Sequence, residues 1–267
     1  MKSLISILTC VLVVALAASW AQIPPGNEAG VAMGHLHLNV RDIAANKTFF
    51  VVLGGSPVKV EPFEIVKFPG VLVYLNLPPG AQPATGGIIG TVVNHFGFRV
   101  RNLQESLTKW KAAGLKLEVG PNPGQAFAYT PDNIRFEILE DKSLTVPIAM
   151  HHIHFFVPEA DVPKIQAWYA KMFGTKPGMR LQNQAADLPG VNLTFSKTPD
   201  PTAGTKGHLL DHIGFEIKNL EAFCKKLEET GMKFDRPYIK TATGLGLAFL
   251  TDPWGTYIEL NEGLDRY

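Results

Sequence analysis

Histidine recurs at four corresponding places along the chain, each time near the start of a short apolar stretch. These stretches read HLHLNV, HFGFRV, HIHFFV and HIGFEI, and their first histidines are His35, His95, His152 and His212. The first two are 60 residues apart, as are the last two, and the second pair follows the first by 117 residues. An imidazole can exchange a proton near neutral pH or bind a metal ion. The spacing therefore predicts a repeated module that presents one chemically active side chain at the same structural position four times.

The residues that follow each histidine predict the elements that position it. A residue able to cap a helix comes after each strand: Asp42, Asn102, Asp161 and Asn219. The helix is expected to end at a glycine, because a left-handed C-terminal cap favours a residue without a β-carbon: Gly54, Gly114, Gly174 and Gly231. Strand-like stretches broken by Pro and Gly come next, among them residues 71–77, 136–139, 191–195 and 257–260. Each module is thus predicted to be a strand and a helix followed by several strands.

The two halves of the chain also match outside the histidines. The sequence FPGVLVYL at residues 68–75 corresponds to LPGVNLTF at 188–195, and LGGSP after residue 52 corresponds to FGTKP after residue 172. Segments rich in Pro, Gly, Ala and Thr join the modules within each half. We therefore expect two halves of two modules each.

With these features, residues 34–262 resemble the vicinal oxygen chelate superfamily, which contains glyoxalase I, extradiol dioxygenases and bleomycin-resistance proteins. The resemblance implies an α+β fold of four βαβββ modules, paired into two domains with curved mixed sheets. We expect an N-terminal domain at residues 34–141 and a C-terminal domain at residues 150–263, preceded by a linker at 22–33. Each curved sheet would surround a cleft able to hold a divalent metal ion.

In that superfamily the metal ligands come from the first and last strands of the modules. The matching first-strand residues are the four histidines above, and the matching last-strand residues are Tyr74, Glu137, Thr194 and Glu259. The resemblance thus implies two sets of two histidines and one carboxylate, namely His35, His95 and Glu137, and His152, His212 and Glu259. Such a set can hold Fe(II), Mn(II) or Zn(II) on one face and leave positions open for substrate.

Other side chains are expected on the same face as these ligands, because alternate residues of a strand point to one side. His37, His154 and Tyr257 are candidates for proton transfer or for hydrogen bonding to the ligands, whereas His151 is expected to face away from His152. A histidine in a strand is more often structural. The glutamates favour a metal site, since FEIL and YIEL are apolar strands in which an unpaired carboxylate would be costly to bury.

One carboxylate per set is more similar to extradiol dioxygenases than to glyoxalases, which use a carboxylate in both modules. The chain departs from the dioxygenase pattern at Phe249, where a tyrosine is expected, and in residues 240–247, which lack an expected histidine. His154 could replace the missing proton-transfer group, which keeps an oxygenase possible. Tyr74 could act as an acid or a ligand, which keeps a glyoxalase-like lyase or isomerase possible. A non-catalytic small-molecule-binding protein of the resistance type is the third alternative.

The N-terminus predicts export. Lys2 precedes an apolar run at residues 4–18 and the sequence Ser19-Trp20-Ala21, which is typical of a signal peptide that comprises residues 1–21 and is removed. We therefore expect a periplasmic or secreted protein with no stable membrane insertion after cleavage. Of the two cysteines, only Cys224 would remain, on the apolar side of a helix, so no internal disulfide is expected.

The composition predicts a packed protein that acts on small molecules. The chain is 46% hydrophobic and 18% charged, with a net charge of +1, which argues against nucleic acid as a partner. No complete dinucleotide-binding or phosphate-binding motif is present, so nucleotide cofactors are not expected. A small-molecule substrate and a monomeric or homodimeric protein are the remaining expectations.

Overall fold

The computed structural model describes residues 23–77 and 88–267. The predicted signal peptide lies outside the described residues, as does most of the linker between the first two modules. The first module contains β1 (Val31–Asn39), α1 (Ile43–Leu53), β2 (Ser56–Val60), β3 (Phe63–Phe68) and β4 (Val71–Asn76). The second contains β5 (Val93–Val100), α2 (Leu103–Ala112), β6 (Lys116–Val119), β7 (Gln125–Tyr129) and β8 (Arg135–Glu140).

The second half repeats this order. The third module contains β9 (Ile148–Val157), η1 (Glu159–Asp161), α3 (Val162–Phe173), β10 (Lys176–Arg180), β11 (Asn183–Leu188) and β12 (Val191–Lys197). The fourth contains β13 (Leu210–Ile217), α4 (Leu220–Glu229), β14 (Arg236–Lys240), β15 (Gly246–Thr251) and β16 (Tyr257–Glu262), and η2 (Leu264–Arg266) follows. The predicted order of one strand, one helix and three strands is confirmed in all four modules.

The predicted helix boundaries have a physical basis in the structure. The side chains of Asp42 and Asn102 accept hydrogen bonds from backbone N–H groups at the starts of α1 and α2. The corresponding Asp161 and Asn219 precede α3 and α4 without a side-chain capping bond. All four glycines predicted at the helix ends have positive φ, as a left-handed turn out of a helix requires. Cys224 is a free, buried residue of α4.

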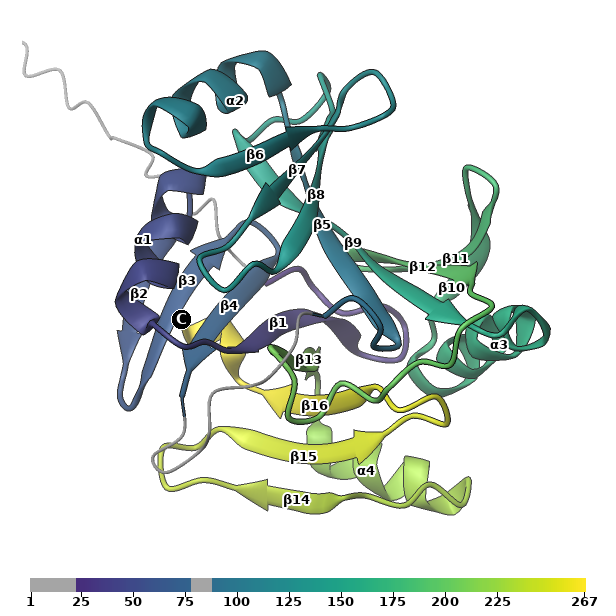
Figure 1. The fold of residues 1–267 in the computed structure, drawn as a ribbon. Helices are drawn as coiled ribbons and strands as arrows, with labels where there is room; N and C mark the ends of the chain where they lie inside the picture. The colour runs from purple at the N-terminus through teal and green to yellow at the C-terminus, as the bar shows by residue number, and fades with distance from the viewer. Residues whose placement is uncertain (1–22, 78–87) are drawn as a thin grey trace, which may run out of the picture.

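The modules pair differently from the prediction. One eight-stranded sheet, here the first sheet, has the order β14-β15-β16-β13-β1-β4-β3-β2, and the second sheet has the order β10-β11-β12-β9-β5-β8-β7-β6. The first sheet therefore joins modules one and four, and the second joins modules two and three. Antiparallel pairing of β1 with β13 and of β5 with β9 forms the two seams. Each sheet draws one module from each half of the chain (Figure 1).

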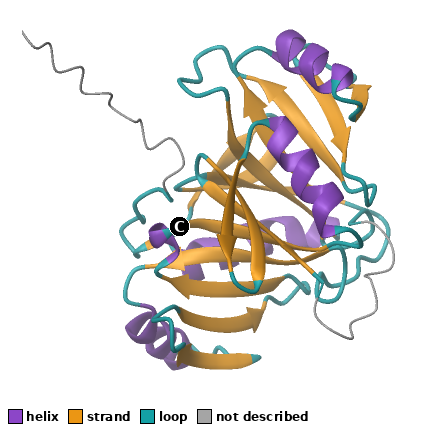
Figure 2. Ribbon diagram, turned by 90° about the vertical axis from the view of Figure 1, so that its left-hand side faces the viewer, coloured by secondary structure: helices purple, strands orange, loops and turns teal. Residues whose placement is uncertain are grey.

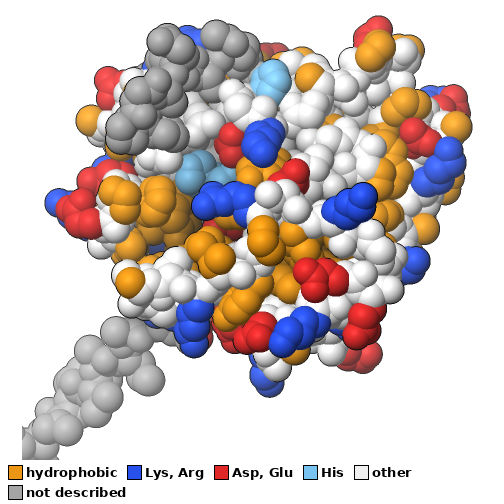
Figure 3. All heavy atoms as spheres, turned by 90° about the horizontal axis from the view of Figure 1, so that it is seen from below, with side chains coloured by type: hydrophobic (Ala, Val, Ile, Leu, Met, Phe, Trp, Pro, Cys, Tyr) orange, Lys and Arg blue, Asp and Glu red, His pale blue; other side chains and the backbone are white. Residues whose placement is uncertain are grey.

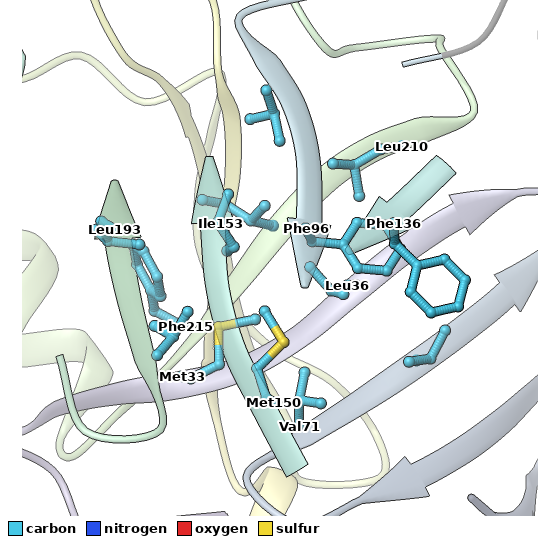
Figure 4. Packing of buried hydrophobic residues seen from close by; sticks show 14 of the residues in the cluster. Met33, Leu36, Val71, Phe96, Phe136, Met150, Ile153, Leu193, Leu210 and Phe215 are labelled. Carbon is cyan, nitrogen blue, oxygen red and sulfur yellow. The ribbon is translucent and has the colours of Figure 1, made fainter. Parts of the chain in front are cut away.

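The core lies where the two sheets meet. Figure 4 shows Met33 and Phe215 of the first sheet close to Met150, Ile153 and Leu193 of the second, and all five side chains are buried. The helices α1, α2, α3 and α4 lie on the outside of the sheets (Figure 1), and more of the described residues lie in strands than in helices (Figure 2). Among the described residues, no helix is both long and apolar enough to span a membrane.

The alternation of side chains along the strands separates this core from the histidine side chains. Leu36 and Leu38 of β1 belong to the apolar core, whereas His35 and His37 point to the other face of the sheet. The central strands thus contribute to both sides, and the histidines are held by a well-packed layer.

Candidate metal centre

Four side chains converge at the middle of the first sheet, and we call them the first cluster: His35, His37, His212 and Glu259. Each offers one ligand atom, these atoms lie within 4.8 Å of one another, and all four residues are buried. Nε2 of His212 is 2.8 Å from Oε2 of Glu259, and Nε2 of His35 is 3.3 Å from the same oxygen. Two imidazoles and one carboxylate therefore face a common point.

A local irregularity in β1 positions His35. Met33 pairs with Phe215 but His35 pairs with Gly214, so that Gly34 is the extra residue of a β-bulge. The ring of His35 lies across Gly214, where a β-carbon would come within 2.0 Å of His35 Cε1. Glycine at position 214 is therefore required for this orientation of the ring.

Neighbouring side chains orient the ligands. Nδ1 of His212 donates to Oδ1 of Asp211 at 2.6 Å, and Nδ2 of Asn261 donates to Oε1 of Glu259 at 2.9 Å. Hydrogen bonds of this kind direct Nε2 of a histidine and the second oxygen of a carboxylate toward a metal ion. Both ring nitrogens of His35 are buried and lack a hydrogen-bond partner within residues 23–77 and 88–267. An unpaired buried nitrogen is costly, and coordination to a metal ion would satisfy it.

The electrostatics of the first cluster favour a cation. Burial alone would raise the pKa of Glu259, but its contacts with His212 and His35 outweigh this effect and hold the pKa well below its usual range. Burial likewise opposes protonation of His212, yet its bonds to Asp211 and Glu259 raise its pKa. The buried carboxylate of Glu259 and the partly buried one of Asp211 thus act on one small volume, and their charge is suited to a divalent ion.

Three of the predicted catalytic residues lie in the first cluster or beside it, namely His37, Tyr74 and Tyr257. The His37 ring stacks on the His212 ring at a centroid distance of 4.3 Å, and the Tyr74 ring lies 4.8 Å from that of His35. Burial raises the pKa of Tyr74 well above its usual value, so that its phenol stays protonated. The Tyr257 ring is 5.7 Å from that of His212. Burial raises the pKa of Tyr257 to about 12.

A cavity of about 630 Å³ opens over the first cluster. Its wall is largely apolar and aromatic, and the side chains that the argument below uses are Phe63, Tyr74, Arg236, Phe249 and Tyr257. The guanidinium of Arg236 lies 4.9 Å from the centre of the Phe249 ring. On the face shown in Figure 3, histidine atoms are visible between hydrophobic and basic side chains. The first cluster is therefore accessible from a pocket that fits a small organic molecule.

The second sheet contains a related group, the second cluster: His95, His152, His154 and Glu137. The three histidines bring their ligand atoms within 4.8 Å of one another. Oε2 of Glu137 is 3.0 Å from Nε2 of His152 and 3.6 Å from Nε2 of His95. Nε2 of His154 bonds to Oγ of Ser196 at 2.7 Å. Burial is the main cause that lowers the pKa of His152 to about 3 and that of His154 to about 2, so both rings are neutral.

The second cluster also contains a guanidinium. Nη2 of Arg180 lies 3.5 Å from Oε2 of Glu137, and its Nη1 donates to Oγ1 of Thr194 at 3.3 Å. Nε2 of Gln125 donates to the other carboxylate oxygen of Glu137. Burial would raise the pKa of Glu137, but the nearby rings of His152 and His95 keep it well below the usual value. Glu137 is thus already surrounded by donors from the protein.

The structure groups the predicted ligands differently from the sequence analysis. All six residues lie in the two clusters, but His35 joins His212 and Glu259, whereas His95 joins His152 and Glu137. The predicted grouping within each half of the chain is wrong because the seams pair β1 with β13 and β5 with β9. That any of the six binds a metal ion stays a prediction.

The expected orientation of His151 is also wrong. Gly97 pairs with His152 but Phe98 pairs with Met150, so that His151 is the extra residue of a bulge in β9. Its Nδ1 lies 2.8 Å from Nδ1 of His152. The simple two-residue alternation of a strand does not hold across a bulge, and nothing in the sequence marks one here.

Sequence reasoning missed two kinds of residue, charged side chains that contact the clusters and glycines that lie beneath the histidine rings. Asp211 directly precedes His212 in β13 and bonds to its ring, and Arg180 reaches Glu137 from β10; neither contact follows from the spacing of the histidines. The glycines of HFGF and HIGF are a signal that could have been used, because Gly97 and Gly214 lie beneath the rings of His152 and His35. A β-carbon at Gly97 would come within 2.2 Å of His152 Cε1.

Comparison with known proteins agrees with this geometry. Residues 149–260 match the sequence profile of the Glyoxalase/Bleomycin resistance protein/Dioxygenase superfamily. These residues belong to that superfamily. The superfamily includes glyoxalase I lyases and dioxygenases. No curated protein sequence matches the chain.

Solved structures extend the superfamily fold over both halves of the chain. Glyoxalase I from Zea mays superimposes with a TM-score of 0.69 at 19% identity, over 88% of this chain and 94% of that one. A putative dioxygenase from Bacillus subtilis subsp. subtilis gives a TM-score of 0.65 at 13% identity, over 91% of this chain and 86% of that one. At these identities the likeness establishes the fold, and the chemistry must be argued from the clusters.

Proposed function

We propose that the first cluster binds one divalent metal ion, Fe(II), Mn(II) or Zn(II), and that the protein is an enzyme that acts on a small organic substrate through neighbouring oxygen atoms. The observation that carries this proposal is His35, whose two buried ring nitrogens have no hydrogen-bond partner although its Nε2 faces Glu259 and His212. His35, His212 and Glu259 would hold the ion. Asp211 and Asn261 already orient two of these three ligands.

A metal ion bound there would draw electron density from the substrate oxygens and make a neighbouring O–H or C–H group more acidic. His37 is the nearest imidazole that the three-ligand set does not use, and it lies against His212 at the base of the cavity. We assign proton acceptance to His37. Tyr74, with its protonated phenol, is assigned to hydrogen bonding of a substrate oxygen.

The cavity wall supports an aromatic or similarly apolar substrate body. Phe63, Phe249 and Tyr257 present ring surfaces, and Phe249 and Tyr257 stack with a centroid distance of 5.2 Å. Arg236 lies on the same wall, where its charge suits an acidic substituent of the substrate. A small molecule with two adjacent oxygens at one end and an apolar body fits these contacts.

Dioxygenase-like chemistry is favoured over glyoxalase-like chemistry. The last-strand position of the first module holds Tyr74, which stays protonated, so that the first cluster offers one glutamate. Two histidines and one carboxylate leave several positions open for substrate and oxygen. Tyr74 beside His35 is the observation that supports a lyase or isomerase instead, because a phenol there can donate a proton to an enolate oxygen.

The test is metal content together with oxygen uptake. His212→Ala and Glu259→Gln should each lose the metal ion, while His95→Ala, the matched change in the second cluster, should keep it. With Fe(II) loaded, oxygen consumption on a panel of catechols is the expected result. Turnover of 2-hydroxycarbonyl compounds without oxygen uptake would move the assignment to a lyase or isomerase. Unchanged metal content in the His212 and Glu259 variants would refute the proposed site.

A further inference from the structure

The two clusters occupy corresponding places in the duplicated fold, so they can be compared residue by residue. The first strand of module one corresponds to that of module three, and the first strand of module four corresponds to that of module two. Corresponding residues are 117 positions apart, which matches Asp211 with Asn94. The strands β2 and β10 correspond at an interval of 120 residues, which matches Val60 with Arg180. Val60 and Arg180 are each the last residue of their strand. Across the hairpin that follows, Val60 pairs with Phe63 and Arg180 pairs with Asn183.

The two differences change the charge in the same direction. Nδ1 of His212 bonds to the carboxylate of Asp211, whereas Nδ1 of His95 lies 2.9 Å from the neutral amide oxygen of Asn94. The first cluster has the apolar Val60 in its cavity wall, while the second has a guanidinium in contact with its glutamate. With neutral histidines, the first cluster and Asp211 together carry two negative charges. The second cluster, with Arg180, carries none.

The side chain of Arg180 is largely buried and contacts the second cluster directly. Its side chain is 15% exposed, compared with 8% for Glu137. Nη2 of Arg180 lies 3.5 Å from the same carboxylate oxygen, Oε2, that faces His95 and His152. Oγ1 of Thr194, on β12 of the same module, accepts a hydrogen bond from Nη1 of Arg180. The guanidinium thus approaches the oxygen that a metal ion would need.

We propose that Arg180 takes the place of a metal ion in the second cluster, so that the protein binds one metal ion per chain. The guanidinium is a positive charge that the protein itself provides. Through its contact with Glu137 it joins modules two and three, as a metal ion in the first cluster would join modules one and four. The count of one ion rests on the metal site proposed above for the first cluster, whereas the role of Arg180 does not depend on that site or on the reaction. The histidines and Glu137 remain a usable ligand set, and Nε2 of His152 has no hydrogen-bond partner, so removal of the guanidinium should open a second site.

The experiment measures Co(II) bound per full-length chain, by elemental analysis and by visible absorption of the bound ion. The wild-type protein and Arg180→Lys, which keeps the charge, should bind one ion. Arg180→Val with Asn94→Asp reproduces the first cluster in the second and should bind two. Adding His152→Ala to this double variant should return the value to one. The reciprocal change, Val60→Arg, should leave no bound ion.

Circular dichroism and thermal unfolding confirm that each variant is folded before its metal content is compared. A wild-type protein that binds two ions, one of which is lost on His152→Ala, would overturn the proposal. So would a folded Arg180→Val, Asn94→Asp variant that binds no more metal than the wild type. A wild type without metal refutes the proposed function, while a gain of one ion in the double variant would still support the role of Arg180.

Discussion

At the scale of single residues, the absence of a side chain matters as much as the ligands. We predict that Gly214→Ala weakens metal binding to the first cluster at least tenfold, about 1.4 kcal/mol, because the new β-carbon would displace the His35 ring. The steric basis is the 2.0 Å approach to His35 Cε1. Isothermal titration with Mn(II) or Zn(II) checks the affinity.

Gly178→Ala is the matched control for this substitution. Gly178 also lies in a strand, β10, but a β-carbon there would meet no atom within 4 Å. The affinity of the Gly178 variant should equal that of the wild type. Equal affinities in both variants would show that the His35 ring does not need the space above Gly214, and would argue against His35 as a ligand.

The charged residues of the clusters show why sequence alone could not decide between one metal ion and two. The four histidines and two glutamates were identified from their repetition, which is a local property of the sequence. Arg180 and Asp211 modify the clusters through contacts whose meaning depends on the fold. A unit charge about 4 Å away at an effective dielectric constant of 20 is worth roughly 4 kcal/mol. Two such differences are large enough to decide whether a divalent ion is bound.

At the scale of elements, a partly buried carboxylate, that of Glu216, fixes the segment after β16. Glu216 of β13 accepts the backbone N–H groups of Gly263 at 2.7 Å and Leu264 at 3.1 Å, where η2 begins. Burial raises the pKa of Glu216 from 4.5 to about 7. Because the folded pKa is above the unfolded one, the protonated carboxyl stabilises the folded state below about pH 4.5. This contribution declines as the pH rises and is lost above about pH 7.

We therefore predict that Glu216→Gln changes the pH dependence of stability. Relative to wild type, the variant should be more stable at pH 8 than at pH 5, by a difference on the order of 3 kcal/mol at most. Urea unfolding at the two pH values measures this difference. Glu228→Gln, at an exposed position of α4, should show the same difference from wild type at both pH values. A Glu216 variant that behaves like the Glu228 variant would contradict the raised pKa.

Elements were the part of the fold that the sequence predicted best. Helix ends follow from a capping residue before each helix and a glycine after it, and strands follow from short apolar runs. The bulges at Gly34 and His151 were not predicted, since each depends on the partner strand as much as on its own residues. That is why His37 was placed correctly by alternation within β1, whereas His151 was not.

At the scale of the whole molecule, the seams explain why the predicted pairing of modules within each half of the chain was wrong. Similarity between the halves of the sequence identifies duplicated modules, but it does not say which modules share a sheet. Modules one and two are joined in sequence, yet β1 pairs with β13 and β5 with β9. The pairing of β1 with β13 is set by long-range contacts between apolar faces, and residues as far apart in the sequence as His35 and Gly214 leave no local pattern that records them.

This topology makes each half of the chain depend on the other. A fragment of residues 23–144 would contain β1 and β5 without their partners β13 and β9, and would expose core residues such as Met33 and Phe96. The complementary fragment of residues 145–267 would expose Met150 and Phe215 in the same way. Such unpaired central strands and apolar faces favour association over independent folding.

We predict that neither fragment is a folded monomer alone, and that mixing them restores a 1:1 complex. Sedimentation and circular dichroism measure the assembly, and the first cluster provides a specific readout because His35 lies on one fragment and His212 and Glu259 on the other. Metal binding to the first cluster should therefore appear only in the mixture. The matched control is the intact chain with a protease site inserted near residue 144, which should stay assembled after cleavage. Two fragments that each unfold cooperatively as monomers would show that consecutive modules can pair after all, and that the seams are not required for folding.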